Sequence, residues 1–130
     1  MKVRGLDCKE TFWPLGKYIY KQRLTCSDIH ERTRNFLTEK YPAMLILEEV
    51  YIPGEKLFLD YYLPSRILAI ECQGAQHEVH SVYFHNTKAE FFAAQSRDRR
   101  KAEWCHLNGI TLVYFYPKET IKEWETKLNL

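Results

Sequence analysis

Residues 67–73 constrain the fold of this chain more than any other segment. They read I-L-A-I-E-C-Q, an almost uninterrupted apolar run. Such a run is typical of a strand in the middle of a sheet, where both faces are covered. A sheet covered on both faces needs a packed layer on each side. The segment therefore predicts a layered α/β structure built around this strand.

Apolar periodicity and turn residues predict the elements around it. A helix is expected over 28–40, with Ser27 or Asp28 as its cap and Pro42 after its end. Strands are expected over 43–52 and 56–63, joined as a hairpin by the turn at 53–55. A helix over about 88–107 leads to a strand over 110–116, which a crossover of that length should pair in parallel. With a last helix over about 118–128, the order predicts an α/β sandwich with a mixed sheet.

Length and composition narrow the class of protein. A chain of 130 residues fits one domain, and 45% hydrophobic with 28% charged residues is ordinary globular composition. The sequence has no apolar run long enough for a membrane span, and residues 1–7 do not resemble a signal peptide, so a cytoplasmic, non-secreted protein is expected. Four scattered cysteines argue against a disulfide framework. A zinc site using Cys8, Cys26 and His30 stays open, because Cys26 and His30 are one helical turn apart.

Residues 1–27 form a basic, aromatic segment ahead of the predicted domain at 28–130. Within 1–25 the net charge is +4, whereas the rest of the chain carries −2. Interleaved cations and rings can follow phosphates and stack on bases. Packing of Phe12, Trp13 and Tyr18 against a sheet edge is an equally weighted alternative. The nucleic-acid contacts predicted in this segment are Lys9, Lys17, Lys21 and Arg23.

Two acidic residues lie where strands are otherwise apolar. Side chains alternate along a strand, so Asp60 shares a face with Phe58 and Tyr62, and Glu71 shares one with Ala69. Burying a lone carboxylate is costly unless it is paired or binds a metal. Carboxylates on adjacent strands are suitable ligands for Mg²⁺. The alternative is that each forms a structural salt bridge, for instance with Arg66 or Lys101.

The long helix repeats this pattern. Asp98 falls in the middle of its predicted inward face, where the neighbouring residues are apolar. A carboxylate in that position needs a partner. Lys101 lies one turn further and can project beside Asp98. An ordinary solvated face with such pairs is the alternative. The cations around Asp98 are Arg97, Arg99, Arg100 and Lys101.

These segments resemble a known family. Residues 70–77, I-E-C-Q-G-A-Q-H, are similar to the I-E-x-[DQ]-G-x-x-H segment of the very short patch repair-like branch of the PD-(D/E)XK nuclease superfamily. Residues 96–101 resemble the R-D-x-x-K helix of this branch, and residues 105–116 resemble its N-G-I-x-L-[IV] strand. Asp60 matches the aspartate of an earlier strand, and Glu31 matches the glutamate of the first helix. The resemblance covers about residues 28–117. The branch includes phage homing endonucleases and small phage and bacterial nucleases. It implies a restriction-endonuclease-like αβββαβ core, here with a C-terminal helix and a basic N-terminal arm.

The resemblance also implies a metal centre. Asp60 and Glu71 would bind Mg²⁺ or Mn²⁺ with the backbone carbonyl of Cys72, and Glu31 would act through a metal-bound water. The metal would lower the pKa of a bound water and neutralise the attacked phosphate.

Catalysis would then use residues beside the metal. The superfamily's usual lysine is replaced here by Gln73, which could hydrogen-bond the attacking water. His77 and Lys101 match positions that take over in this branch, as a general base and as a cation that stabilises developing charge. Asp98 would orient either one.

The function expected is that of a metal-dependent DNA endonuclease encoded by a phage or mobile element. Cleavage of only one DNA strand stays open. Arg97, Arg99 and Arg100 would help to bind DNA, and RNA stays open as a substrate. The alternative is a catalytically inactive nuclease-fold protein that binds DNA or a host protein. A third possibility is a nuclease that acts only as a homodimer or with a host or phage partner.

Overall fold

The computed structural model describes residues 1–19, 21–22, 26–73 and 88–130. A four-stranded sheet has the order β3-β4-β5-β6, formed by Leu47–Ile52, Leu57–Leu63, Leu68–Cys72 and Thr111–Phe115. The first three strands are antiparallel neighbours, and β6 pairs in parallel with β5. The mixed α/β sheet and its parallel crossover, both predicted from the sequence, are confirmed.

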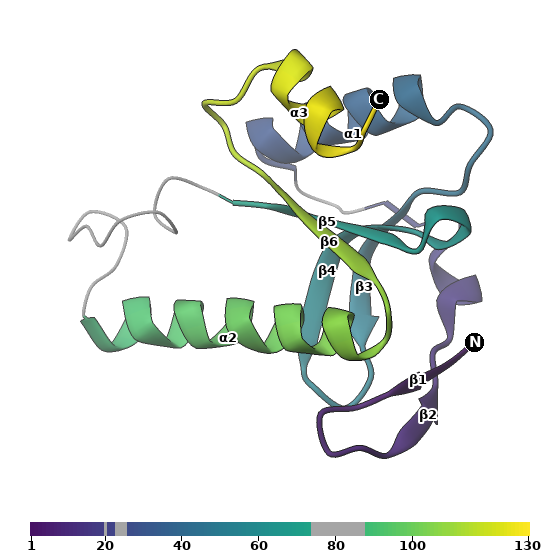
Figure 1. The fold of residues 1–130 in the computed structure, drawn as a ribbon, viewed down its shortest axis with the longest axis vertical. Coiled ribbons are helices and arrows are strands. Elements are labelled where there is room, and N and C mark those ends of the chain that lie inside the picture. The colour runs from purple at the N-terminus through teal and green to yellow at the C-terminus, as the bar shows by residue number, and fades with distance from the viewer. Residues whose placement is uncertain (20, 23–25, 74–87) are drawn as a thin grey trace.

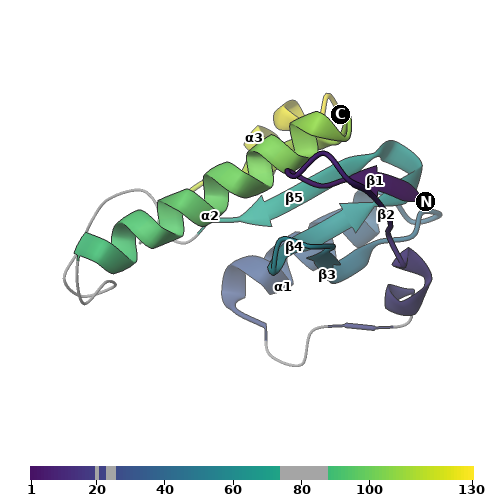
Figure 2. The same cartoon turned by 90° about the horizontal axis from the view of Figure 1, so that it is seen from below.

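Helices of the described residues cover both faces of the sheet. Helices α1 (Asp28–Lys40) and α3 (Ile121–Lys127) lie on one side and α2 (Lys88–Leu107) on the other, as Figures 1 and 2 show. Ser27 caps α1, since its side chain accepts a hydrogen bond from the His30 N–H. Gly109 follows α2 with φ +68°, the left-handed conformation that ends many helices. These elements match the predicted ones, except that β3 and α3 begin about three to four residues later.

Each face of the sheet has its own apolar core. On the α1 and α3 side, Phe115 stacks on Trp124 with ring centroids 4.1 Å apart, and Phe36 meets both rings edge-on. On the α2 side, Trp104 and Cys105 pack under Tyr62 and Ala69. The strand β5 separates the two cores, as its apolar sequence predicted.

The N-terminal segment is part of the second core. Strands β1 (Lys2–Arg4) and β2 (Glu10–Phe12) form a small antiparallel sheet, followed by a 3-10 turn, η1 (Leu15–Tyr18). The Trp13 ring is fully buried, 4.7 Å from the Tyr62 ring and 5.0 Å from that of Trp104, and its Nε1–H donates to the carbonyl of Tyr51 at 2.9 Å. Tyr18 is also buried, but Phe12 is 64% exposed. The packing alternative therefore holds for two of the three rings.

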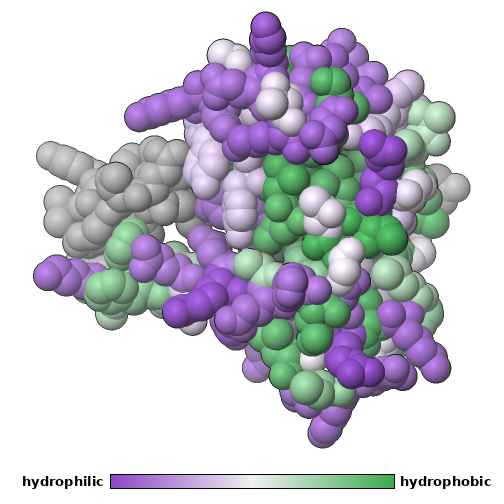
Figure 3. Space-filling view, viewed as in Figure 1, coloured by the Kyte–Doolittle hydropathy of each residue, from purple (hydrophilic) through white to green (hydrophobic). Residues whose placement is uncertain are grey.

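The strand β6 lies at an edge of the described sheet. Figure 3 shows apolar side chains gathered over this strand, between the α3 layer and α2. Leu112, Val113 and Tyr114 are half-buried there. Among the described residues, no helix is both long enough and apolar enough to cross a membrane.

Candidate metal centre

The site begins where β4 and β5 stop pairing through their backbones. The ladder extends from Leu63↔Leu68 to Tyr61↔Ile70. One residue further, carboxylates replace carbonyls as acceptors. The Asp60 N–H donates to Glu71 Oε2 at 2.7 Å, and the Cys72 N–H donates to Asp60 Oδ2 at 2.8 Å. The two acidic side chains therefore cross-connect the strands and lie against each other.

Lys101 joins this pair from α2. Its Nζ lies 2.6 Å from Glu71 Oε1, and the Glu71 side chain is 3% exposed. Alternation along β5 turns Glu71 toward α2, and the spacing along the helix places Lys101 above it. The salt bridge considered as an alternative for Glu71 is thus present, but it belongs to a cluster with a second carboxylate.

The pKa values of the two carboxyl groups are shifted in opposite directions. Burial, and then the charge of Asp60, raise the pKa of Glu71 to about 8, although Lys101 opposes this. Burial acts to raise the pKa of Asp60 as well, but hydrogen bonds from His30, Glu71 and the Cys72 backbone lower it to about 2. Such divergence is the behaviour of two close, interacting carboxyl groups. Burial and the charge of Asp60 therefore both oppose a negative charge on Glu71.

His30 approaches the same aspartate from α1. Its Nε2 lies 3.3 Å from Asp60 Oδ1, and its Nδ1 lies 2.6 Å from the hydroxyl of Ser27. The Tyr61 hydroxyl donates to the backbone carbonyl of His30 at 2.7 Å. The helix cap and the sheet thus both fix the position of this ring.

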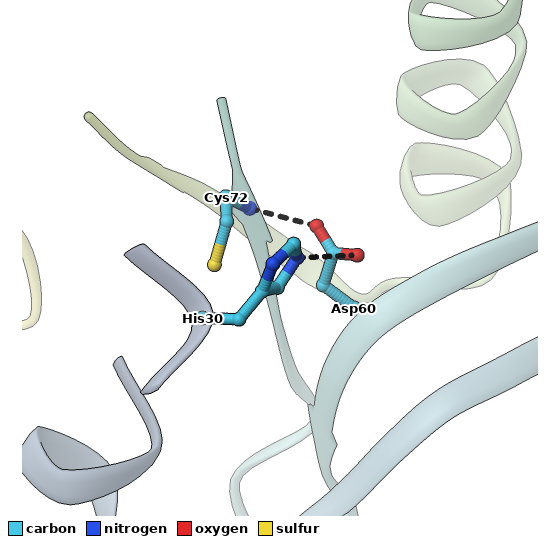
Figure 4. Close-up of side chains that lie close together, drawn as sticks. All are labelled: His30, Asp60 and Cys72. Atoms are coloured by element: carbon cyan, nitrogen blue, oxygen red, sulfur yellow. Dashed lines mark hydrogen bonds and ion pairs between the residues drawn. The ribbon is translucent and has the colours of Figure 1, made fainter. Parts of the chain in front are cut away.

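The Cys72 thiol completes a group of three possible metal ligands. One donor atom each from His30, Asp60 and Cys72 lie within 4.8 Å of one another. Figure 4 shows these side chains converging from α1, β4 and β5. The thiol also donates to the Thr33 hydroxyl at 3.3 Å. Two overlapping donor sets therefore share Asp60, one of two carboxylates and one of mixed nitrogen, oxygen and sulfur.

Glu31 is not part of this arrangement. Its exposed side chain lines an open groove of about 390 Å³ between α1 and α3, together with Arg32, Phe36 and Ile121. The structure does not bring Glu31 together with Asp60 and Glu71, since successive residues of a helix point about 100° apart, and its role through a metal-bound water stays a prediction. The helix residue at Asp60 is His30.

Sequence reasoning missed His30. A usable signal was its spacing of three residues from Thr33, which lies on the buried face of α1 and contacts Cys72. The structure does not group His30 with Cys8 and Cys26, the residues of the suggested zinc site. Among the described residues, His30 is grouped with Asp60 and Cys72, whereas Cys8 and Cys26 are exposed.

Two further predicted residues follow Glu71 in the chain. Gln73 is 6% exposed, and its backbone N–H donates to the Phe115 carbonyl at 2.9 Å, which extends the pairing of β5 with β6. Its Oε1 is shielded and makes no directed hydrogen bond with the described residues. His77 lies outside the described residues.

The remaining predicted residues of α2 lie along one stretch of that helix. Asp98 is half-buried and close enough to Tyr114 to help burial raise the pKa of that phenol to about 12. Arg97 and Arg99 are exposed, and Arg100 is half-buried. The helix that supplies Lys101 to the site therefore also presents cations to solvent.

The predicted cations of the N-terminal segment lie elsewhere. Lys9 belongs to the hollow between the β1–β2 hairpin and the β3–β4 turn. Lys17 is exposed with its Nζ over the Tyr18 ring, and Lys21 lies beside Glu48 and Glu49 of β3. Figures 1 and 2 both show the hairpin at the opposite end of the molecule from the start of α2. Arg23 lies outside the described residues.

Comparison with known proteins gives two partial matches. The chain is 36% identical over 62 residues to uncharacterized protein 033L of Invertebrate iridescent virus 3, covering 48% of this chain and 32% of that protein. It is 39% identical over 57 residues to uncharacterized protein 307L of Invertebrate iridescent virus 6, covering 44% and 29%. The chain thus matches about a third of the length of these relatives. No protein-family model and no solved structure matches it.

Proposed function

We propose that this chain is a divalent-metal-dependent nuclease with a restriction-endonuclease-like core that hydrolyses phosphodiester bonds in DNA. One observation carries the proposal. Asp60 and Glu71 are held together at the point where two central strands separate, with the ammonium group of Lys101 at 2.6 Å from Glu71. A buried carboxylate and a half-buried one, together with a lysine, are a costly arrangement for stability alone. They are the groups that phosphoryl chemistry requires.

The donor set fits a hard divalent cation. The pKa of Glu71 is raised to about 8, first by its burial and then by repulsion from the charge of Asp60. A cation between the carboxylates removes that repulsion. Each carboxylate oxygen has two lone pairs, so an oxygen that already accepts from Lys101, His30 or the backbone can also bind a cation. Oxygen ligands of this kind suit Mg²⁺ or Mn²⁺.

The residues of the chain would have distinct tasks. When bound, the metal supplies a nucleophilic water of lowered pKa and neutralises phosphate charge. Asp60 and Glu71 hold it, and the strand hydrogen bonds fix their orientation. Lys101 is positioned to stabilise negative charge next to Glu71, a task that Gln73 cannot perform at the usual lysine position. His77 remains the predicted base.

The electrostatics of α2 support DNA as the substrate. Arg97 and Arg99 are exposed on the helix that supplies Lys101 to the carboxylate pair, so phosphates bound by them would lie along that helix. The N-terminal cations are displaced from this site by the packing of the hairpin. We therefore expect α2 to make the main contacts with DNA, and Lys9, Lys17 and Lys21 to contribute less to binding.

A non-catalytic DNA-binding protein is the second candidate. It is favoured by one feature, since both oxygens of Glu71 already have partners in Lys101 and the Asp60 N–H. In that case the cluster would be a structural ion pair, and α2 would bind DNA without cutting it.

Incubation with supercoiled plasmid separates the two candidates. The chain is tested with Mg²⁺, Mn²⁺ or EDTA, beside Glu71→Gln and the exposed control Glu103→Gln prepared in parallel. Metal-dependent nicking or linearisation that Glu71→Gln loses and Glu103→Gln keeps is the expected result. Retarded migration without cleavage in either metal would support the binding protein instead.

A further inference from the structure

We infer that His30, Asp60 and Cys72 form a second metal site, one selective for thiophilic transition cations such as Zn²⁺. The site shares Asp60 with the carboxylate pair but uses a different face of it. Asp60 Oδ1 points to His30 on α1, whereas Glu71 lies toward α2. Imidazole and thiolate ligands favour zinc-like ions over Mg²⁺.

The geometry is close to that of a tetrahedral site. Bonds of about 2.0–2.3 Å place tetrahedral donors roughly 3.3–3.8 Å apart. His30 Nε2 and Asp60 Oδ1 are already 3.3 Å apart, and all three donors lie within 4.8 Å. A closure of about 1 Å would complete three protein ligands and leave a fourth position for water.

Each ligand is also held from behind. Ser27 contacts His30 Nδ1 at 2.6 Å, which leaves Nε2 as the nitrogen facing Asp60. The Cys72 N–H holds Asp60 Oδ2, and Thr33 holds the Cys72 thiol. Supporting contacts of this kind orient the ligands of known metal sites.

The His30 nitrogen faces Asp60 away from solvent. Its Nε2 is shielded and lies 3.3 Å from Asp60 Oδ1, with which it forms an ion pair. A cation bound between these two atoms would replace that contact and leave both atoms with a partner.

Sharing Asp60 has a consequence that rests on the proposed function. A zinc ion bound to Asp60 Oδ1, with thiolate and imidazole, withdraws that carboxylate from the Mg²⁺ site. Zn²⁺ would then raise the Mg²⁺ concentration needed for cleavage, and Cys72→Ser would reduce this effect.

Titration of the metal-free chain with Co²⁺ tests the site without any activity. We expect a thiolate-to-cobalt charge-transfer band and the intense visible bands of tetrahedral cobalt, both displaced by Zn²⁺. Cys72→Ser should remove the charge-transfer band, and His30→Gln should weaken Co²⁺ binding at least about tenfold. Circular dichroism checks that both variants fold, and Cys72→Ala provides a second removal of the thiol.

Two controls make the assignment specific. The double variant Cys8→Ser/Cys26→Ser should keep the band, since those thiols lie outside the cluster. Glu71→Gln should also keep it while losing metal-dependent cleavage, which separates this inference from the proposed function. Absence of the band in the wild type, its persistence in folded Cys72→Ser and Cys72→Ala, or its loss in the Cys8/Cys26 variant would overturn the site.

Discussion

The N-terminal hairpin and the β4–β5 junction both bury large side chains, but with opposite chemistry. Trp13 in the hairpin region is fully buried between Tyr62 and Trp104, and its polar atom donates to a backbone carbonyl. Glu71 at the junction is 2% exposed and is surrounded by a second carboxylate and an ammonium group. Burial stabilises the first region through apolar contact, whereas it opposes ionisation in the second.

The two regions therefore have different roles, since the hairpin region stabilises the fold and the junction holds the candidate site. Removing Trp13 would take away packing that connects η1, β4 and α2. Neutralising Glu71 would relieve repulsion within the carboxylate pair. We therefore expect stability to depend on the hairpin region and chemistry to depend on the junction, and each prediction below tests that division.

The largest effect should come from Trp13→Ala. Truncating a fully buried tryptophan typically costs about 3–5 kcal/mol, which is a large part of the stability of a small domain. Urea denaturation of this variant and of Phe12→Ala, whose ring is exposed, measures the difference. Equal stability of the two variants would show that the hairpin does not belong to the core.

This result also bears on deletion of residues 1–25. Although α1 begins with its own cap, this deletion would remove Val3, Trp13 and Tyr18 from the core. We expect the truncated chain to lose cooperative unfolding, and a sharp urea transition near that of the wild type would contradict this.

The next effect concerns the junction. Asp60→Asn and Glu71→Gln should each reduce a confirmed metal-dependent cleavage at least about 10³-fold, because each removes a ligand charge and leaves the volume unchanged. Their thermal stability should stay near that of the wild type. Full cleavage by either variant would refute the role of the pair.

How far the sequence predicts this junction can be argued from three residues. Alternation and the apolar neighbours of Asp60 and Glu71 were enough to find both carboxylates. His30 was missed because the rotation of α1 about its axis depends on contacts with Tyr61 and Cys72 of the sheet, which no local pattern contains. The long helices and strands, in contrast, were predictable because their periodic apolar pattern is contained in the local sequence.

The hairpin region shows the opposite case. Strands of three residues, such as β1 and β2, are too short for a period-two pattern. Their position depends on distant contacts, among them the Arg4 N–H donating to Asn108 Oδ1 at 2.7 Å. Sequence alone could therefore propose that Trp13 packs, but could not decide it.

A smaller effect is expected for Lys101. Lys101→Met keeps the stem but removes the charge beside Glu71, and should slow cleavage about 10²-fold, the scale for one electrostatic group. The matched control is Arg97→Met on the exposed face of α2, which should weaken DNA binding more than it slows cleavage at saturation. A similar loss of the rate in both variants would place Lys101 among ordinary phosphate contacts.

The smallest effect is a pH dependence of stability in EDTA. The pKa of Glu71 is about 8 in the fold, above its ordinary 4.5, so the fold favours the protonated form. The resulting stability is complete below pH 4.5 and is lost as the pH rises through 8. Between pH 6 and 8 the free energy of unfolding should fall by about 2 kcal/mol. Urea titrations should show this fall in the wild type and a flatter profile in Glu71→Gln; parallel profiles would contradict it.

The central claim is that Asp60 and Glu71 bind one hard divalent cation between them. Calorimetric titration of the metal-free wild type with Mn²⁺ tests it most directly, alongside Asp60→Asn, Glu71→Gln and the controls Glu103→Gln and Cys72→Ser. The account predicts one Mn²⁺ per chain in the wild type and both controls, and at least about tenfold weaker binding in the two carboxylate variants. Equal Mn²⁺ binding by the wild type and by Asp60→Asn or Glu71→Gln would contradict it.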